Sequence, residues 1–231
     1  QRYIAIKFSV VGRDLGSTVE EAISKVSRNV TLPSGYHVEW AGEYASQKRA
    51  DKRMALVIPI TVLAIFLILY TMFRSYKWSM LVLVSVMMAS IGGPLALFIT
   101  HTNFSVSSAV GFLALFGVSV ETGVIMIEFI NQLRTSWKGS AMSPQEQIIE
   151  AAVEGSVQRL RPIMMTMLVA TLGLLPAALS HAIGSDSQRP FAIVIVGGLI
   201  ANLVIGIFLM PTLYVWMARE GDVMEVIDGK G

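Results

Sequence analysis

The sequence predicts a predominantly α-helical membrane protein, in which five transmembrane helices follow a small β-α-β piece. Composition, a set of long uncharged runs and an alternating segment near the N-terminal end lead to this fold class. Of the 231 residues, 54% are hydrophobic and 15% are charged, whereas a soluble domain carries about 25% charged residues. The net charge of +2 and the absence of a basic stripe argue against nucleic acid as a partner.

Residues 1–41 have the pattern of a strand, a helix and a second strand. Apolar side chains alternate with others over residues 3–11, which is the period of a strand with one buried face. Ser17 and Glu20 have the spacing of a capping box and predict a helix start. Alternation returns at 36–40. This unit is too small to bury a core alone, so we expect it to end a larger soluble α+β domain, and the chain to be a fragment of a longer protein.

Residues 42–231 are expected to form a membrane domain. A transmembrane helix needs about 20 apolar residues, and five segments meet this requirement: about 54–73, 78–100, 106–133, 162–180 and 191–217. The Gly92-Gly93-Pro94 sequence predicts a kink or a close approach in the second span. A capping box at Ser143 followed by an apolar stripe predicts an amphipathic helix at about 144–157, lying on the membrane surface.

Basic residues in the short loops predict the orientation. Six cationic side chains lie in the loops after the first and third spans: Arg74, Lys77, Arg134, Lys138, Arg159 and Arg161. The positive-inside rule therefore places these loops, the amphipathic helix and the C-terminus in the cytoplasm, and residues 1–41 outside.

Two carboxylates lie within the third span. Glu121 is about midway along it, and Glu128 is two turns closer to the cytoplasmic end, on nearly the same helix face. An ionised carboxylate at membrane depth costs at least about 2.5–3.5 kcal/mol, so it should be paired, hydrated or protonated. For Glu121 we favour a residue that binds and releases protons over a static polar contact. Glu128 can reach water at the interface, and for it the static interpretation is favoured.

Arg159 and Thr166 lie seven residues apart at the start of the fourth span, on one helix face. Arg159 can pair with a carboxylate of a neighbouring helix, and the Thr166 hydroxyl can relay a proton. Alternatively, Arg159 is an ordinary cytoplasmic charge and Thr166 bonds to its own backbone. The residues alone leave both interpretations open.

Methionine is common, with 13 residues. Thioethers are soft ligands that suit Cu(I) or Ag(I), and the membrane-embedded candidates are Met126, Met164, Met165 and Met167. Methionine also fills apolar interiors, which is the favoured interpretation here, so the metal site stays unknown. No metalloprotease, nucleotide-loop or nucleophile-elbow motif is present. The sequence thus predicts neither an enzyme nor a cofactor.

Four blocks in order resemble the RND superfamily of proton-driven exporters: LPSGYHVEWAGEY, GFLALFGVSVETGVIMIEFINQLR, RLRPIMMTMLVATLGLLP and GSDSQRPFAIVIVGGL. They are most similar to its heavy-metal branch, the cobalt–zinc–cadmium and copper–silver pumps. The resemblance implies the C-terminal membrane half of an inner-membrane pump that exports heavy-metal cations by proton antiport. Residues 1–41 would end a periplasmic porter subdomain, and the spans would be the eighth to twelfth of twelve.

The resemblance also implies site residues. Glu121 falls at the tenth-helix position that faces aspartates of the fourth helix, and Arg159 and Thr166 match the arginine and threonine associated with the proton relay. Glu128 is the remaining candidate of that relay. Copper–silver members carry a lysine where this chain has Ile163, and the QRPFAIVIVGG block looks more like the divalent-metal pumps.

Partners follow from the same resemblance. They are metal cations, protons, membrane lipid and the N-terminal half of the same pump, in a homotrimer with a periplasmic adaptor and an outer-membrane channel. Two alternatives stay open. One is a drug or amphiphile exporter of the superfamily, and the other is a non-transporting scaffold or accessory module in which Glu121 is structural.

Overall fold

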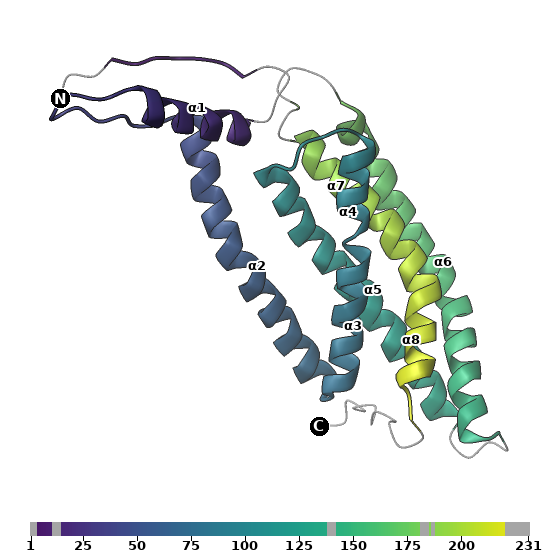
Figure 1. Ribbon diagram of the computed structural model, residues 1–231. Coiled ribbons are helices and arrows are strands. Elements are labelled where there is room, and N and C mark those ends of the chain that lie inside the picture. Colours follow the sequence, from purple (N-terminus) through teal and green to yellow (C-terminus); the bar gives the residue numbers. More distant parts are fainter. Residues whose placement is uncertain (1–3, 11–14, 138–141, 181–184, 186–187, 220–231) are drawn as a thin grey trace, which may run out of the picture. The chain divides into compact units, whose positions relative to one another are not determined.

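The computed structural model describes residues 4–10, 15–137, 142–180, 185 and 188–219 (Figure 1). These residues belong to two compact units, Gln1–Val57 and Ile58–Gly231, which are described separately. Helix α2 (Glu43–Phe73) begins in the first unit and ends in the second.

The first unit contains the expected helix, but the expected strands are not confirmed. Helix α1 (Leu15–Asn29) buries Val19 and carries an ion pair of 2.7 Å between Lys25 and Glu21. No strand is formed at 4–10 or at 30–42, within the described residues. A strand needs a neighbour for its backbone groups, and two strands alone are marginally stable. Ile4 is 93% exposed, so the apolar face of the first predicted strand has nothing to pack against here.

The second unit is a helical bundle. After α2 come α3 (Tyr76–Ala89), α4 (Gly92–Ile99), α5 (Val106–Ser136), α6 (Pro144–Leu179), α7 (Gln188–Val204), the π-helix η1 (Ile205–Leu209) and α8 (Met210–Met217). Among the described residues, five helical stretches are long and apolar enough to cross a membrane: α2, α3 with α4, α5, α6, and α7 through α8. The prediction of five spans is confirmed at this level.

The second span is interrupted as Gly92, Gly93 and Pro94 predict. Helix α3 ends at Ala89 and α4 begins at Gly92. The same glycines also allow a close approach to α7, because a Cβ on Gly93 would lie 3.1 Å from Val194 and one on Gly197 would lie 2.7 Å from the Gly92 carbonyl oxygen. The interruption of the helix and the close approach therefore occur together.

Helix α6 runs without a break from Pro144 to Leu179. The sequence predicts a surface helix at 144–157 and a separate span at 162–180, and both segments belong to this one helix. The first turns of α6 pack against other helices. Ile148 and Ala152 are buried in the main core, and a Cβ on Gly155 would lie 2.8 Å from the Ile130 side chain of α5. Helix α6 thus packs against α5 in its first turns and continues through Pro162.

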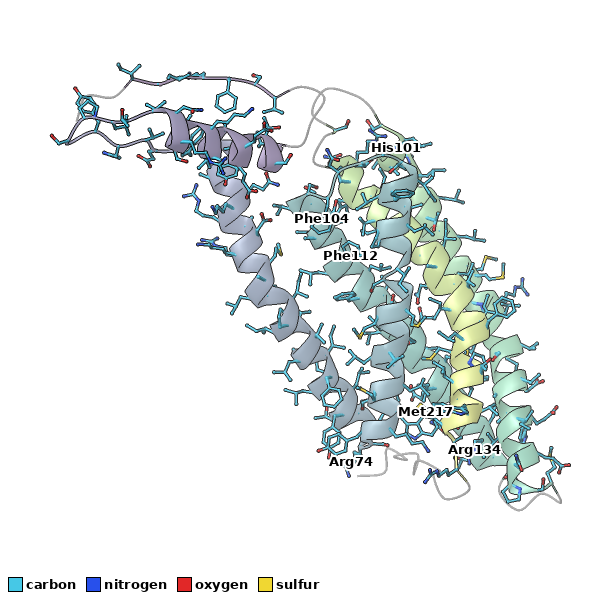
Figure 2. The ribbon with its side chains drawn as sticks, viewed as in Figure 1. Arg74, His101, Phe104, Phe112, Arg134 and Met217 are labelled. Atoms are coloured by element: carbon cyan, nitrogen blue, oxygen red, sulfur yellow. The ribbon has the colours of Figure 1, made fainter. Side chains whose placement is uncertain are left out.

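The core of the bundle lies around α5 and the last span. Its largest fully buried side chains come from five helices: Leu69, Trp78, Leu81, Leu115, Met126, Ile127, Ile130, Leu199 and Tyr214. Figure 2 shows Arg74, Arg134 and Met217 at one end of this unit, and His101 and Phe104 at the other. The third and fifth spans therefore run in the same direction.

Candidate functional site

Helix α5 positions the two carboxylates. It starts with a capping box, in which the Ser108 amide donates to Ser105 Oγ at 3.3 Å. Glu121 lies near the middle of the helix, and both Glu121 and Glu128 are exposed in this chain. They share one exposed stripe of α5 with Ala114, Gly117 and Gln132. The opposite face of α5 is buried in the core.

Helix α6 brings Arg159 beside α5, but not onto a glutamate. The Arg159 guanidinium lies over the Phe129 ring, 4.2 Å from its centroid, which is a cation–π contact. The Arg159 Nε is buried and has no hydrogen-bond partner. Among the described residues no ion pair joins Arg159 to Glu121 or Glu128. The guanidinium is thus held against Phe129, the residue that follows Glu128 in α5, and its Nε is a buried donor without a partner.

Thr166 is exposed on α6, and its hydroxyl donates to the carbonyl oxygen of Ile163 at 3.0 Å, with Pro162 O at 3.3 Å. This local bonding corresponds to the second of the two interpretations that the sequence leaves open. A hydroxyl rotates to suit its surroundings, so the same group can also donate to another acceptor.

The four candidate methionines do not form one cluster. Met126 and Met167 are buried in the core, whereas Met164 and Met165 are 37% and 55% exposed. The described residues also contain no group of three or more His, Cys, Asp or Glu side chains that could hold a metal ion. Core packing accounts for the two buried thioethers.

A buried polar cluster that the sequence does not predict lies at the Arg134 end of the bundle (Figure 2). Tyr214 of α8 donates to Asn131 Oδ1 at 2.5 Å, and Arg134 Nη1 donates to the Tyr214 hydroxyl at 3.1 Å. The Tyr214 ring stacks on Trp78 of α3, with centroids 4.6 Å apart. The positive-inside rule counts Arg134 as a charge in a loop. The three-residue spacing of Asn131 and Arg134 is the sequence feature that could have predicted a shared, buried helix face.

A second buried polar contact lies on the core side of α5, at Thr122, the residue after Glu121. The Asn202 side-chain amide of α7 donates to Thr122 Oγ1 at 3.4 Å. Ser119 Oγ, one turn earlier on α5, is buried without a hydrogen-bond partner. A polar side chain inside an uncharged run is the sequence signal for Asn202, since such residues are rarely lipid-facing.

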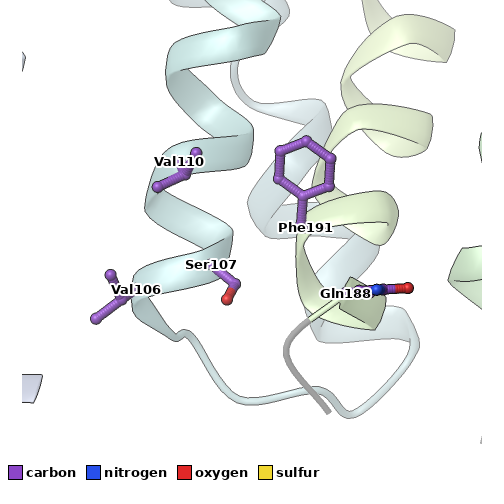
Figure 3. A pocket seen from close by; sticks show the side chains of 5 residues that line it. All are labelled: Val106, Ser107, Val110, Gln188 and Phe191. Atoms are coloured by element: carbon purple, nitrogen blue, oxygen red, sulfur yellow. The ribbon is translucent and has the colours of Figure 1, made fainter. Parts of the chain in front are cut away.

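A shallow pocket of about 320 Å³ lies between the first turns of α5 and α7, lined by Val106, Ser107, Val110, Gln188 and Phe191 (Figure 3). Its walls are mainly apolar. Val110 and Glu121 are eleven residues apart on α5, which is about 16 Å along the axis. The pocket is therefore separate from the carboxylates.

These features define a multi-pass membrane protein with ionisable side chains at mid-span, an arrangement typical of ion-coupled transport. The sequence model of the AcrB/AcrD/AcrF family matches residues 1–218, and the chain belongs to this family, within the RND heavy-metal efflux group.

Named relatives cover nearly the whole chain. The cobalt-zinc-cadmium resistance protein CzcA of Cupriavidus metallidurans is 37% identical over 225 residues, which is 97% of this chain and 20% of the relative. Protein HelA of Legionella pneumophila is 40% identical over 214 residues, 93% of this chain and 20% of the relative. An X-ray structure of a heavy metal efflux pump, crystal form II, matches with a TM-score of 0.74 and 40% identity over 90% of this chain and 20% of that chain. The chain spans about a fifth of the length of the curated relatives it matches.

Proposed function

We propose that this chain is the C-terminal membrane half of an inner-membrane pump that exports heavy-metal cations in exchange for protons. The observation that carries the proposal is the exposed Glu121 near the middle of α5. A carboxylate at membrane depth faces protein or water rather than lipid, because a lipid-facing charge is too costly. The stripe that carries Glu121 therefore needs a polar cover, and the N-terminal half of the same pump would supply it.

In this proposal Glu121 carries the coupling proton. A carboxylate suits the task because it exists in two protonation states and accepts hydrogen bonds in the charged one. Glu128 lies about 10 Å further along the same stripe, where it would extend the polar path towards one side of the membrane.

Arg159 and Thr166 would assist from α6. The unpaired Nε of Arg159 is buried beside Phe129, and a buried guanidinium donor favours a carboxylate partner. In the complete pump, a carboxylate of the covering half would pair with the Arg159 guanidinium, because the residue as a whole is only half-buried. The Thr166 hydroxyl is exposed, so it remains available for exchange of its local hydrogen bonds.

The cargo and the assembly follow from the relatives. The name of CzcA mentions cobalt, zinc and cadmium, and the matched crystal structure is titled a heavy metal efflux pump; we extend this class of cargo to the present chain. We further propose a homotrimer with a periplasmic adaptor and an outer-membrane channel. The Arg74 and Arg134 end of the bundle would be cytoplasmic by the positive-inside rule. Residues 1–41 would complete a periplasmic porter sheet, which would cover Ile4 and its neighbours.

The test uses the full-length parent pump in a metal-sensitive host that lacks its own efflux systems. Growth is compared across Zn, Co, Ni, Cu and Ag, with a dye and a bile salt alongside, for wild type, Glu121→Gln, Glu121→Asp and Glu128→Gln at equal expression. We expect wild type to protect against at least one metal and Glu121→Gln to give no protection. Glu121→Asp should retain part of the protection, because it keeps a carboxylate, and Glu128→Gln should be milder.

Each result has a clear meaning. Full protection by Glu121→Gln would make the carboxylate structural and would end the proton-carrier assignment. Protection against dye or bile salt alone would instead indicate an amphiphile exporter. No protection by wild type against any compound, at normal membrane expression, would support a non-transporting module.

A further inference from the structure

Asn202 is a buried side chain of the last span that the proposed proton path does not use. It is 4% exposed, and its amide donates to Thr122 Oγ1 at 3.4 Å. Thr122 follows Glu121 directly in α5. Because consecutive helix residues point about 100° apart, Thr122 lies buried while Glu121 is exposed. Asn202 thus contacts the turn that carries Glu121 from the core side.

The hydrogen bonds of Thr122 make this contact directional. The Thr122 hydroxyl donates to the Val118 carbonyl oxygen at 3.0 Å, which leaves its oxygen lone pairs to accept from Asn202. The nearby Ser119 hydroxyl is buried without a partner. Thr122 therefore links the last span to the α5 backbone just before Glu121.

The last span changes its helical form beside the same turn. Two residues after Asn202 the α-helix ends, and the π-helix η1 follows. In η1, a Cβ on Gly206 would lie 3.4 Å from Thr122 Cγ2. Past η1, a Cβ on Gly123 would lie 2.9 Å from Met210 Cε. A π turn holds an extra residue and is common at functional sites, and here it lies where the last span contacts residues 122 and 123.

We propose that Asn202 is a positioning residue for Glu121, which acts through Thr122 by fixing the rotation and height of the α5 turn that carries the carboxylate. The inference rests on the proposed role of Glu121 in proton coupling. A purely structural hydrogen bond would affect stability alone. A positioning contact would also change the rate at which the Glu121 carboxyl group reacts with a chemical label.

The test measures Glu121 directly in the full-length pump. A hydrophobic carbodiimide labels the Glu121 carboxyl group, and mass spectrometry gives the labelling rate at fixed pH for wild type, Asn202→Leu, Thr122→Val and the double variant. We expect each single variant to change the rate by the same factor, about twofold or more, as for residues in direct contact. The double variant should change it no further. Ser79→Ala is the matched control, because it removes a buried hydroxyl of another helix that bonds only locally, to Ser75 O at 2.9 Å; its rate should equal that of wild type.

An unchanged labelling rate in a folded Asn202→Leu protein would overturn the inference, and additive effects would overturn the route through Thr122. If Asn202→Leu does not reach the membrane, Thr122→Val decides, because an unchanged rate in it has the same meaning. The proposed function can fail separately. If Glu121→Gln still exports metal while the labelling effects appear, Asn202 positions Glu121 but Glu121 does not carry the proton.

Discussion

Replacing Gly197 with alanine should separate α4 from α7. A Cβ on Gly197 would lie 2.7 Å from the Gly92 carbonyl oxygen and closer still to Ala96 Cβ. Ordinary contacts of a Cβ begin at 3.4 Å, so the two backbones would have to move apart by about 0.7 Å or more. No rotamer change relieves this contact, because Gly92 contributes backbone and Ala96 contributes only its Cβ.

The magnitude is obtained by comparison with a glycine in open space. Overpacking costs about 1–3 kcal/mol, and a contact with backbone should lie at the upper end of that range. Alanine in place of helical glycine also gains about 0.8–1 kcal/mol of helix propensity. Gly173 of α6 has no atom within 4 Å of its Cβ position, so Gly173→Ala carries the propensity gain alone. The difference between the two variants should therefore be about 3 kcal/mol.

Unfolding of the purified protein in mixed detergent micelles, followed by tryptophan fluorescence, measures this difference. We expect Gly173→Ala to be at least as stable as wild type and Gly197→Ala to be less stable. Gly92→Ala should resemble Gly197→Ala, and the double variant should cost less than the sum, because residues in contact are not additive. Equal stability of Gly197→Ala and Gly173→Ala would refute the reasoning.

Two further changes test the buried cluster and a helix cap. Tyr214→Phe keeps the stack on Trp78 but removes the hydroxyl between Asn131 and Arg134, so it should cost about 1–3 kcal/mol in the same unfolding assay. A stability equal to wild type would mean that this hydroxyl is dispensable. Ser105→Ala removes the acceptor for an orphan amide at the start of α5 and should cost about 1 kcal/mol, seen as faster hydrogen exchange of that first turn. Ser107→Ala is its control and should leave the exchange unchanged.

Length and lack of charge predict the membrane helices well, because a span is defined by local composition. The interruption at Gly92 and Pro94 is also local, since the cause lies in the residues themselves. The strands at 3–11 and 36–40 are different. Their alternating pattern indicates which face should be buried. A strand forms only when it pairs with a neighbouring strand, and the described residues contain no strand for this pairing.

Part of the site is predictable for the same reason. The seven-residue spacing places Glu121 and Glu128 on one face, and both lie on the exposed stripe of α5. The contact of Asn131 with Tyr214 joins residues 83 positions apart, so no local pattern indicates it. The cation–π contact of Arg159 depends in turn on how α6 packs on α5. Pairings of this kind require the tertiary fold.

The continuous helix α6, which contains Pro162 and Pro176, is longer than a membrane span requires. Its 36 residues span about 54 Å, whereas the hydrocarbon core is about 30 Å thick, so about 24 Å of helix projects beyond it. A rocking of roughly 10° within the membrane, small beside usual helix tilts, would move the projecting tip by about 4 Å. Since Gly155 of the projecting part packs on Ile130, that displacement would be passed back to the helix that carries Glu121.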